Sequence, residues 1–123
     1  MKAALHTVSA VFELGAGLAL LAVPSLTATL LIGAKLDGPG PLTVARIGGA
    51  GLLALGAACF FARGDPQSAA ARGVITAMLV YNVAATAVLA YAGAGLSLHG
   101  VGLWPAVVLH AAMAVWCATA RMT

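Results

Sequence analysis

Three side chains that can take part in acid–base or hydrogen-bond chemistry stand inside long apolar segments. They are Glu13, Asn82 and His110, and their neighbours are mostly Ala, Leu, Val and Gly. A carboxyl group, an amide and an imidazole can hold a proton, a small polar ligand or one another. These groups are costly in an apolar medium and turn toward each other or toward trapped water. They are the first candidates for a ligand or proton site.

Two more residues join these candidates because they can reach the same place. Tyr81 directly precedes Asn82, and Arg46 stands about six residues, or roughly 9 Å along a helix, from the centre of its own apolar segment. The Arg46 guanidinium can extend inward to Glu13 or outward to a lipid phosphate. Glu13 can alternatively share a proton with His110. The two pairings imply opposite protonation states of Glu13, and the sequence leaves both open.

The elements that carry these residues are membrane-spanning helices. Of the 123 residues, 63% are hydrophobic and only 7% are charged, whereas a soluble domain has about a quarter charged residues. The net charge of +3 includes no basic run, which argues against a nucleic-acid partner. The composition therefore predicts a protein whose main solvent is the lipid bilayer.

Apolar windows of about 20 residues, the length that crosses a bilayer, predict four spans. Pro24 interrupts the apolar sequence after the first span and favours a short interfacial helix over 25–33; a kinked, tilted extension of the first span is the alternative. Short connections make neighbouring helices antiparallel. We therefore expect an all-α, multi-pass fold, an up-down four-helix bundle forming one domain over 1–123. The expected spans are 3–23, 42–62, 72–92 and 102–120.

Counting residues from the span centres places the candidate side chains at one depth. Glu13 and Asn82 lie at the centres of the first and third spans, and His110 lies next to the centre of the fourth. His6 and Ser9 fall on the same face of the first helix as Glu13. This polar layer is interpreted either as an interhelical hydrogen-bond clamp or as a functional proton or ligand site.

The second span offers small residues at that depth. We expect it to pack through a small-residue ridge, and we expect the third span to begin at an Asp65-Pro66 cap. The residues of the ridge are Ala50, Ala54 and Ala58.

The basic residues near the span ends predict the orientation. Four of them fall on the side of the two termini and two on the other side, which favours cytoplasmic termini. The four are Lys2, Arg63, Arg72 and Arg121; the two are Lys35 and Arg46.

No motif for catalysis, a cofactor or a metal is present. The sequence has no phosphate-binding loop, dinucleotide fingerprint or nucleophile elbow, and Cys59 and Cys117 have no zinc-site spacing. Both cysteines are expected to be buried as small apolar side chains. We expect no enzyme activity, cofactor or metal, and as partners the bilayer together with further copies of the chain or a larger membrane complex.

Most of the chain resembles the small bacterial four-helix membrane proteins of the DoxX-like kind. The segments that carry this likeness are "FELGAGLALLAVPSLTATLLIGA", "ARIGGAGLLALGAACFFAR", "LVYNVAATAVLAYAG" and "LWPAVVLHAAMAVWCA". The resemblance implies a bacterial inner-membrane protein, in some cases linked to redox complexes, and it brings no catalytic residues. The single embedded carboxyl group in the first helix is also similar to that of small multidrug resistance transporters, where it exchanges protons for cationic drugs. Only Glu13 carries over from that architecture.

Three functions follow as expectations. The first is an accessory or scaffolding subunit whose polar layer is structural or binds a small ligand. The second is a proton-coupled transporter that works through Glu13 as an oligomer. The third is a membrane redox or enzyme partner that uses His110 with Cys117 or a bound cofactor.

Overall fold

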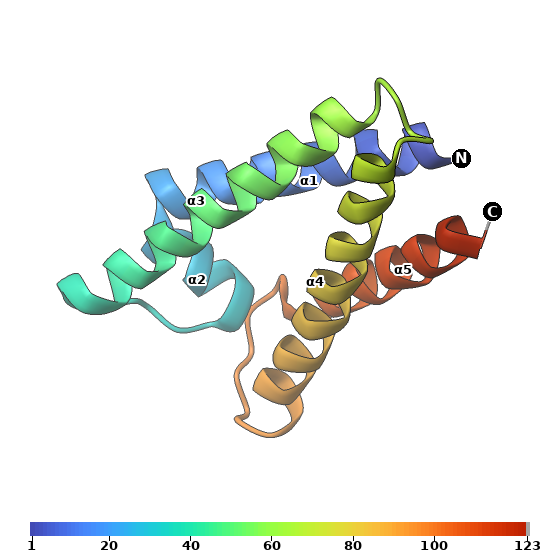
Figure 1. The fold of residues 1–123 in the computed structure, drawn as a ribbon. Helices are drawn as coiled ribbons and strands as arrows, with labels where there is room; N and C mark the ends of the chain where they lie inside the picture. The colour runs from blue at the N-terminus through green and yellow to red at the C-terminus, as the bar shows by residue number, and fades with distance from the viewer. Residues whose placement is uncertain (123) are drawn as a thin grey trace.

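The computed structural model describes residues 1–122, which form five α-helices and contain no strand. The predicted all-α class is confirmed for this part of the chain; Thr123, the last residue of the expected domain, lies outside the described residues. Figure 1 shows the helices in chain order: α1 (Lys2–Ala22), α2 (Pro24–Ile32), α3 (Pro39–Ala62), α4 (Ala69–Ala94) and α5 (Leu103–Met122).

Four of these helices, α1, α3, α4 and α5, are long and apolar enough to cross a membrane. This is the character of a multi-pass membrane protein. The helix ends differ from the expected spans by no more than three residues. The differences of three residues are at the starts of α3 and α4, which begin at Pro39 and Ala69. Proline fits the first helical turn because the amide hydrogen it lacks has no partner there.

The helical conformation is interrupted between α1 and α2 at Val23, which has φ −133° and ψ 58°. Pro24 then occupies the first turn of α2, so the predicted start of a separate short helix is confirmed. Figure 1 shows α2 turned out of the line of α1 and toward the segment that joins α4 to α5.

Helices α1 and α3 form a close antiparallel pair. A Cβ atom built on Gly17 would lie 2.8 Å from the carbonyl oxygen of Gly49, and one on Gly56 would lie 2.9 Å from the backbone nitrogen of Leu14. Residues therefore pair in opposite order along the two helices. The absence of side chains at these glycines lets the two backbones come into direct contact, as small residues do in membrane proteins.

The predicted alanine ridge of α3 is wrong. Ala50 and Ala54 are exposed and Ala58 is half-buried, whereas Gly49 and Gly56 are buried against α1. Ala50 and Gly49 are adjacent in the sequence and stand about 100° apart around a helix. The contact is therefore made by a neighbouring stripe of small residues.

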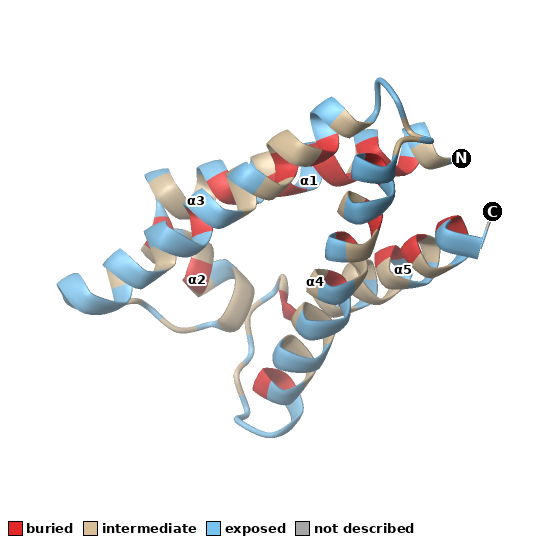
Figure 2. Cartoon of the chain, viewed as in Figure 1, coloured by how far each residue is buried: buried red, intermediate tan, exposed pale blue. Residues whose placement is uncertain are grey.

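Helices α4 and α5 form the second antiparallel pair, and the two pairs meet at one end of the molecule. Figure 2 shows buried positions on α1 and α3 where they approach α4, and along α5. The contact combines the first half of α1, the end of α3, the first half of α4 and the second half of α5. Its buried apolar residues are Leu5, Ala10, Cys59, Ile75, Met78, Met113, Cys117 and Ala120.

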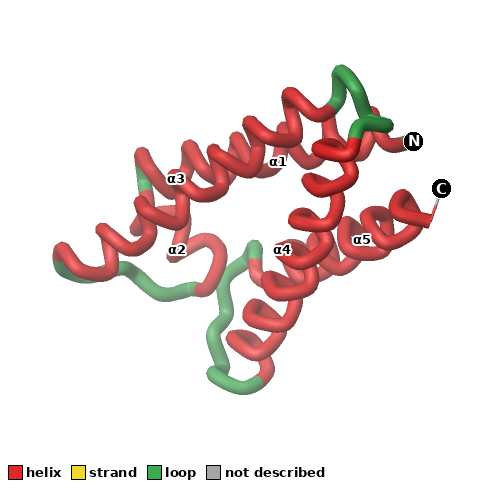
Figure 3. The backbone as a smooth tube through the Cα atoms, in the orientation of Figure 1, coloured by secondary structure: helices red, strands yellow, loops and turns green. Residues whose placement is uncertain are grey.

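A second connection joins the pairs at the opposite end, between α2 and the α4–α5 loop. The backbone nitrogen of Gly102 donates to the carbonyl oxygen of Leu30 at 2.8 Å. A Cβ on Gly100 would overlap the Leu31 carbonyl group, and one on Gly33 would lie 2.7 Å from the carbonyl oxygen of His99. Gly33 also has φ 74°, which favours glycine. The loops that make this connection are seen in Figure 3.

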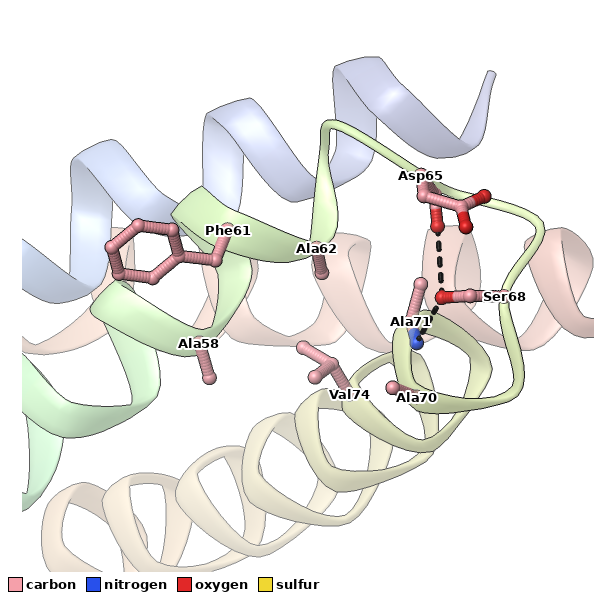
Figure 4. Close-up of a pocket in the computed structure, with 8 residues that line it drawn as sticks. All are labelled: Ala58, Phe61, Ala62, Asp65, Ser68, Ala70, Ala71 and Val74. Atoms are coloured by element: carbon pink, nitrogen blue, oxygen red, sulfur yellow. Dashed lines mark hydrogen bonds between the residues drawn. The ribbon is translucent and has the colours of Figure 1, made fainter.

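Ser68, in the short connection between α3 and α4, is the N-cap residue of α4. The Ser68 hydroxyl accepts a hydrogen bond from the backbone nitrogen of Ala71 at 3.1 Å and donates to the carbonyl oxygen of Asp65 at 2.9 Å (Figure 4). The predicted cap at Asp65-Pro66 is therefore wrong. A serine oxygen three residues before the bonded amide satisfies the helix end equally well, and it lies closer to the first regular turn.

Candidate functional site

The structure brings Asn82 and His110 together as the sequence predicts. The side-chain oxygen of Asn82 lies 2.8 Å from Nδ1 of His110. This contact joins α4 to α5. The Tyr81 ring meets the imidazole edge to face, with ring centres 5.5 Å apart. Three of the five candidate residues thus form one contact between two helices.

The Asn82 amide is held in a defined orientation. Its nitrogen donates to the carbonyl oxygen of Met78 at 2.8 Å, one turn earlier in the same helix. The oxygen is then left to accept, so Nδ1 of His110 is the donor. Asn82 is 1% exposed, and the bond satisfies a group that would otherwise be costly to bury. This arrangement has the properties of an interhelical clamp, named here the Asn82–His110 clamp.

Glu13 is buried near the clamp but is not part of it. Its side chain is 4% exposed, and it lies within electrostatic range of Cys59 on α3 and Tyr81 on α4. Among the described residues it forms no hydrogen bond and no ion pair. The anticipated pairing with His110 is therefore not formed; Nδ1 of the imidazole contacts Asn82 instead.

The alternative pairing, between Glu13 and Arg46, is not formed either. Arg46 is exposed, and its Nε donates to the carbonyl oxygen of Leu21 at 3.3 Å. Carbonyl groups in the last turn of a helix lack partners within that helix, so the end of α1 offers the guanidinium an acceptor much closer than Glu13. Arg46 thus supports the end of α1 and does not reach the candidate site.

Two further polar residues, His6 and Ser9, belong to the same buried stripe of α1 as Glu13. Each is 1% exposed. Nε2 of His6 and the hydroxyl oxygen of Ser9 are buried and have no hydrogen-bond partner. The sequence placed these residues on the face of Glu13 but did not include them in the candidate site. The signal was their spacing of three, four and seven residues, which puts all three on one helix face.

Both cysteines are buried and free, as expected for small apolar side chains. Cys59 and Cys117 are each 0% exposed and belong to the apolar contact between the helix pairs. Within residues 1–122, no group of three or more His, Cys, Asp and Glu side chains is arranged to hold a metal ion. The redox alternative based on His110 with Cys117 stays a prediction.

A shallow hollow of about 250 Å³ lies between the end of α3 and the start of α4 (Figure 4). Its walls are largely apolar, with Phe61 and Val74 among them, and Asp65 and Ser68 stand at the loop. Glu13 is not among its lining residues. This hollow is therefore separate from the buried polar residues of α1.

No family model, curated protein or solved structure matches the chain. The resemblance to DoxX-like proteins accordingly stays a prediction, and the functional argument depends on the geometry of the buried polar residues.

Proposed function

We propose that this chain is a small accessory or scaffolding membrane protein that binds a small polar ligand or a proton at Glu13. The observation that carries the proposal is the buried, unpaired carboxyl group of Glu13 beside the contact of the two helix pairs. In this proposal the Asn82–His110 clamp is structural and sets the register of α4 against α5. The two kinds of polar residue therefore have different roles.

Packing alone does not account for an unpaired carboxyl group at this position. An ionisable side chain within a membrane span costs several kcal/mol unless it meets a partner or water, and such residues usually have a functional role. An apolar side chain of similar size at position 13 would fill the same space without that cost. The presence of a carboxyl group at this position supports a ligand or proton as its partner.

The proposed setting is the inner membrane of a bacterium, with both termini in the cytoplasm and the four spans in up-down order. Support comes from charge: Lys2, Arg63 and Arg121 stand at the end of the molecule that holds the termini and the α3–α4 loop (Figure 1). Helix α2, which follows the first span directly, is proposed to lie at the opposite membrane interface. This setting is the one that a DoxX-like relationship would imply.

Proton-coupled transport by an oligomer is the second candidate, and it is favoured by the same unpaired carboxyl group. A carboxyl group that is not fixed by a protein partner is free to exchange a proton for a cation. Four helices that diverge into two pairs enclose little space on their own, so transport would need more than one copy of the chain.

Glu13→Gln tests the role of Glu13 in proteoliposomes. With an internal pH dye and an imposed gradient of tetraphenylphosphonium, the wild-type protein is expected to couple cation movement to proton movement if it is a transporter. The Gln variant is expected to lose this coupling, because an amide cannot release a proton. Thr7→Val is the matched control, since Thr7 is exposed on α1 and its hydroxyl bonds only to the carbonyl oxygen of Ala3.

Coupled flux that survives Glu13→Gln would rule out transport through this residue. No flux in either protein would leave the accessory role, for which the measurement is what co-purifies with wild-type protein from its native membrane. A bound molecule that is retained by Thr7→Val and lost from Glu13→Gln is the expected result. Equal retention by both variants would contradict the Glu13 site.

A further inference from the structure

We propose that His6, Ser9 and Glu13 hold a file of internal water that connects Glu13 with one aqueous side, the side at which the N-terminus lies. The proposal rests on the role proposed for Glu13 and adds the route by which water and protons reach it. Its observations are the two other polar side chains of the stripe, both of which lack partners.

The spacing of the three residues suits bridging by water. Along the helix axis His6 and Ser9 are separated by about 4.5 Å, and Ser9 and Glu13 by about 6 Å. Side chains three and four residues apart on a helix are neighbours, yet Nε2 of His6 and the Ser9 hydroxyl make no hydrogen bond to each other or to another described group. One or two water molecules in each interval would complete a continuous chain.

The energetics favour water at these positions. A buried polar atom left without a hydrogen bond costs about 1–3 kcal/mol. Nε2 of His6 and the Ser9 hydroxyl are two such atoms on one stripe, and the Glu13 carboxyl group is a third group without a partner among residues 1–122. Internal waters typically make about three hydrogen bonds to groups of this kind. A shared file satisfies all three groups together.

The stripe has a polar end and a closed end. One turn before His6, Nζ of Lys2 lies 3.4 Å from the side-chain oxygen of Gln67, at the exposed end of the molecule. One turn beyond Glu13, Gly17 lies in backbone contact with Gly49, where even a Cβ atom would not fit. The file therefore opens toward the N-terminal end and stops at Glu13.

Water-edited solid-state NMR on the full chain in proteoliposomes tests the file directly. Magnetisation is transferred from water protons, and its build-up is followed at Ser9 Cβ, at Glu13 Cδ and at the methyl group of Ala10. Ala10 is the internal control because it is adjacent to Ser9 and 3% exposed, but it belongs to the apolar contact. We expect build-up at Ser9 and Glu13 to be several-fold faster than at Ala10; equal rates at all three would overturn the proposal.

Variants then test the route. Ser9→Ala and His6→Phe remove the two intermediate partners, and the build-up at Glu13 is expected to fall toward that at Ala10. A rate at Glu13 that is unchanged in both variants would show that water arrives by another path and would overturn the file. If Glu13→Gln abolishes flux while Ser9 is as dry as Ala10, the file fails but the role of Glu13 stands. If the stripe is hydrated but flux or ligand retention is unaffected by Glu13→Gln, the file stands and the proposed role of Glu13 fails.

Discussion

Replacing Gly17 with Val is expected to lower the free energy of unfolding by about 3 kcal/mol, the upper end of the usual cost of overpacking. The first added carbon would lie 2.8 Å from the carbonyl oxygen of Gly49 and 2.9 Å from Cγ of Leu53. The Gly49 oxygen and the Leu53 nitrogen, also at 2.9 Å, are backbone atoms, so relief requires α1 and α3 to move apart. Steric trapping of the protein in lipid bicelles measures the loss.

Gly15→Val is the matched control for this prediction. Gly15 is on the same helix two residues earlier, is exposed, and has nothing within 4 Å of an added Cβ. Its replacement is expected to change stability by no more than about 0.5 kcal/mol, as at other unconstrained surface positions. If the two variants lose the same stability, the close pairing of α1 with α3 is wrong.

Asn82→Leu is expected to lower the free energy of unfolding by about 1–2 kcal/mol. The change removes the acceptor of the His110 imidazole and leaves its Nδ1 without a partner in a half-buried position. Stranding a hydrogen-bonding group costs about 1–3 kcal/mol in proteins, and hydrogen bonds between membrane helices have been found at the lower end of this range. The same unfolding measurement applies.

A double-mutant cycle isolates the clamp from the effects of each replacement. His110→Phe keeps a ring against Tyr81, with which the imidazole makes its edge-to-face contact, and removes the donor. When it is combined with Asn82→Leu, the two losses are expected to be less than additive, by about 0.6–1.7 kcal/mol. Strictly additive losses would mean that the Asn82–His110 bond contributes nothing to stability.

The helices were predictable from the sequence because hydropathy over about 20 residues depends on composition alone. The contact faces were not. The α1–α3 contact uses Gly49 and Gly56, whereas the sequence suggested the ridge of Ala50, Ala54 and Ala58. Both stripes are small and apolar, so composition does not distinguish them. The choice depends on how α3 rotates against the glycine at position 17.

The sequence predicted the depth of the candidate residues along their helices, but it predicted only some of the contacts between their side chains. Counting residues from the span centres placed Asn82 and His110 at one level, and they form a hydrogen bond. Whether Glu13 meets a partner depends instead on how the two helix pairs are arranged, which a single sequence does not specify; it has none among the described residues. Of the two directions open to Arg46, the inward one to Glu13 is not taken for a local reason, since the guanidinium bonds the carbonyl oxygen of Leu21 at the end of α1.

The central claim is that Glu13 is unpaired in the folded chain and serves a ligand or proton, while the Asn82–His110 clamp serves the fold. The free energy of unfolding of Glu13→Met in bicelles tests this most directly, because Met has a similar length and no group that needs a partner. We predict that the variant is as stable as the wild-type protein or more stable, as expected when a functional polar group is replaced by an apolar one. A loss of more than about 1 kcal/mol, the typical value of a hydrogen bond to a protein partner, would contradict the account.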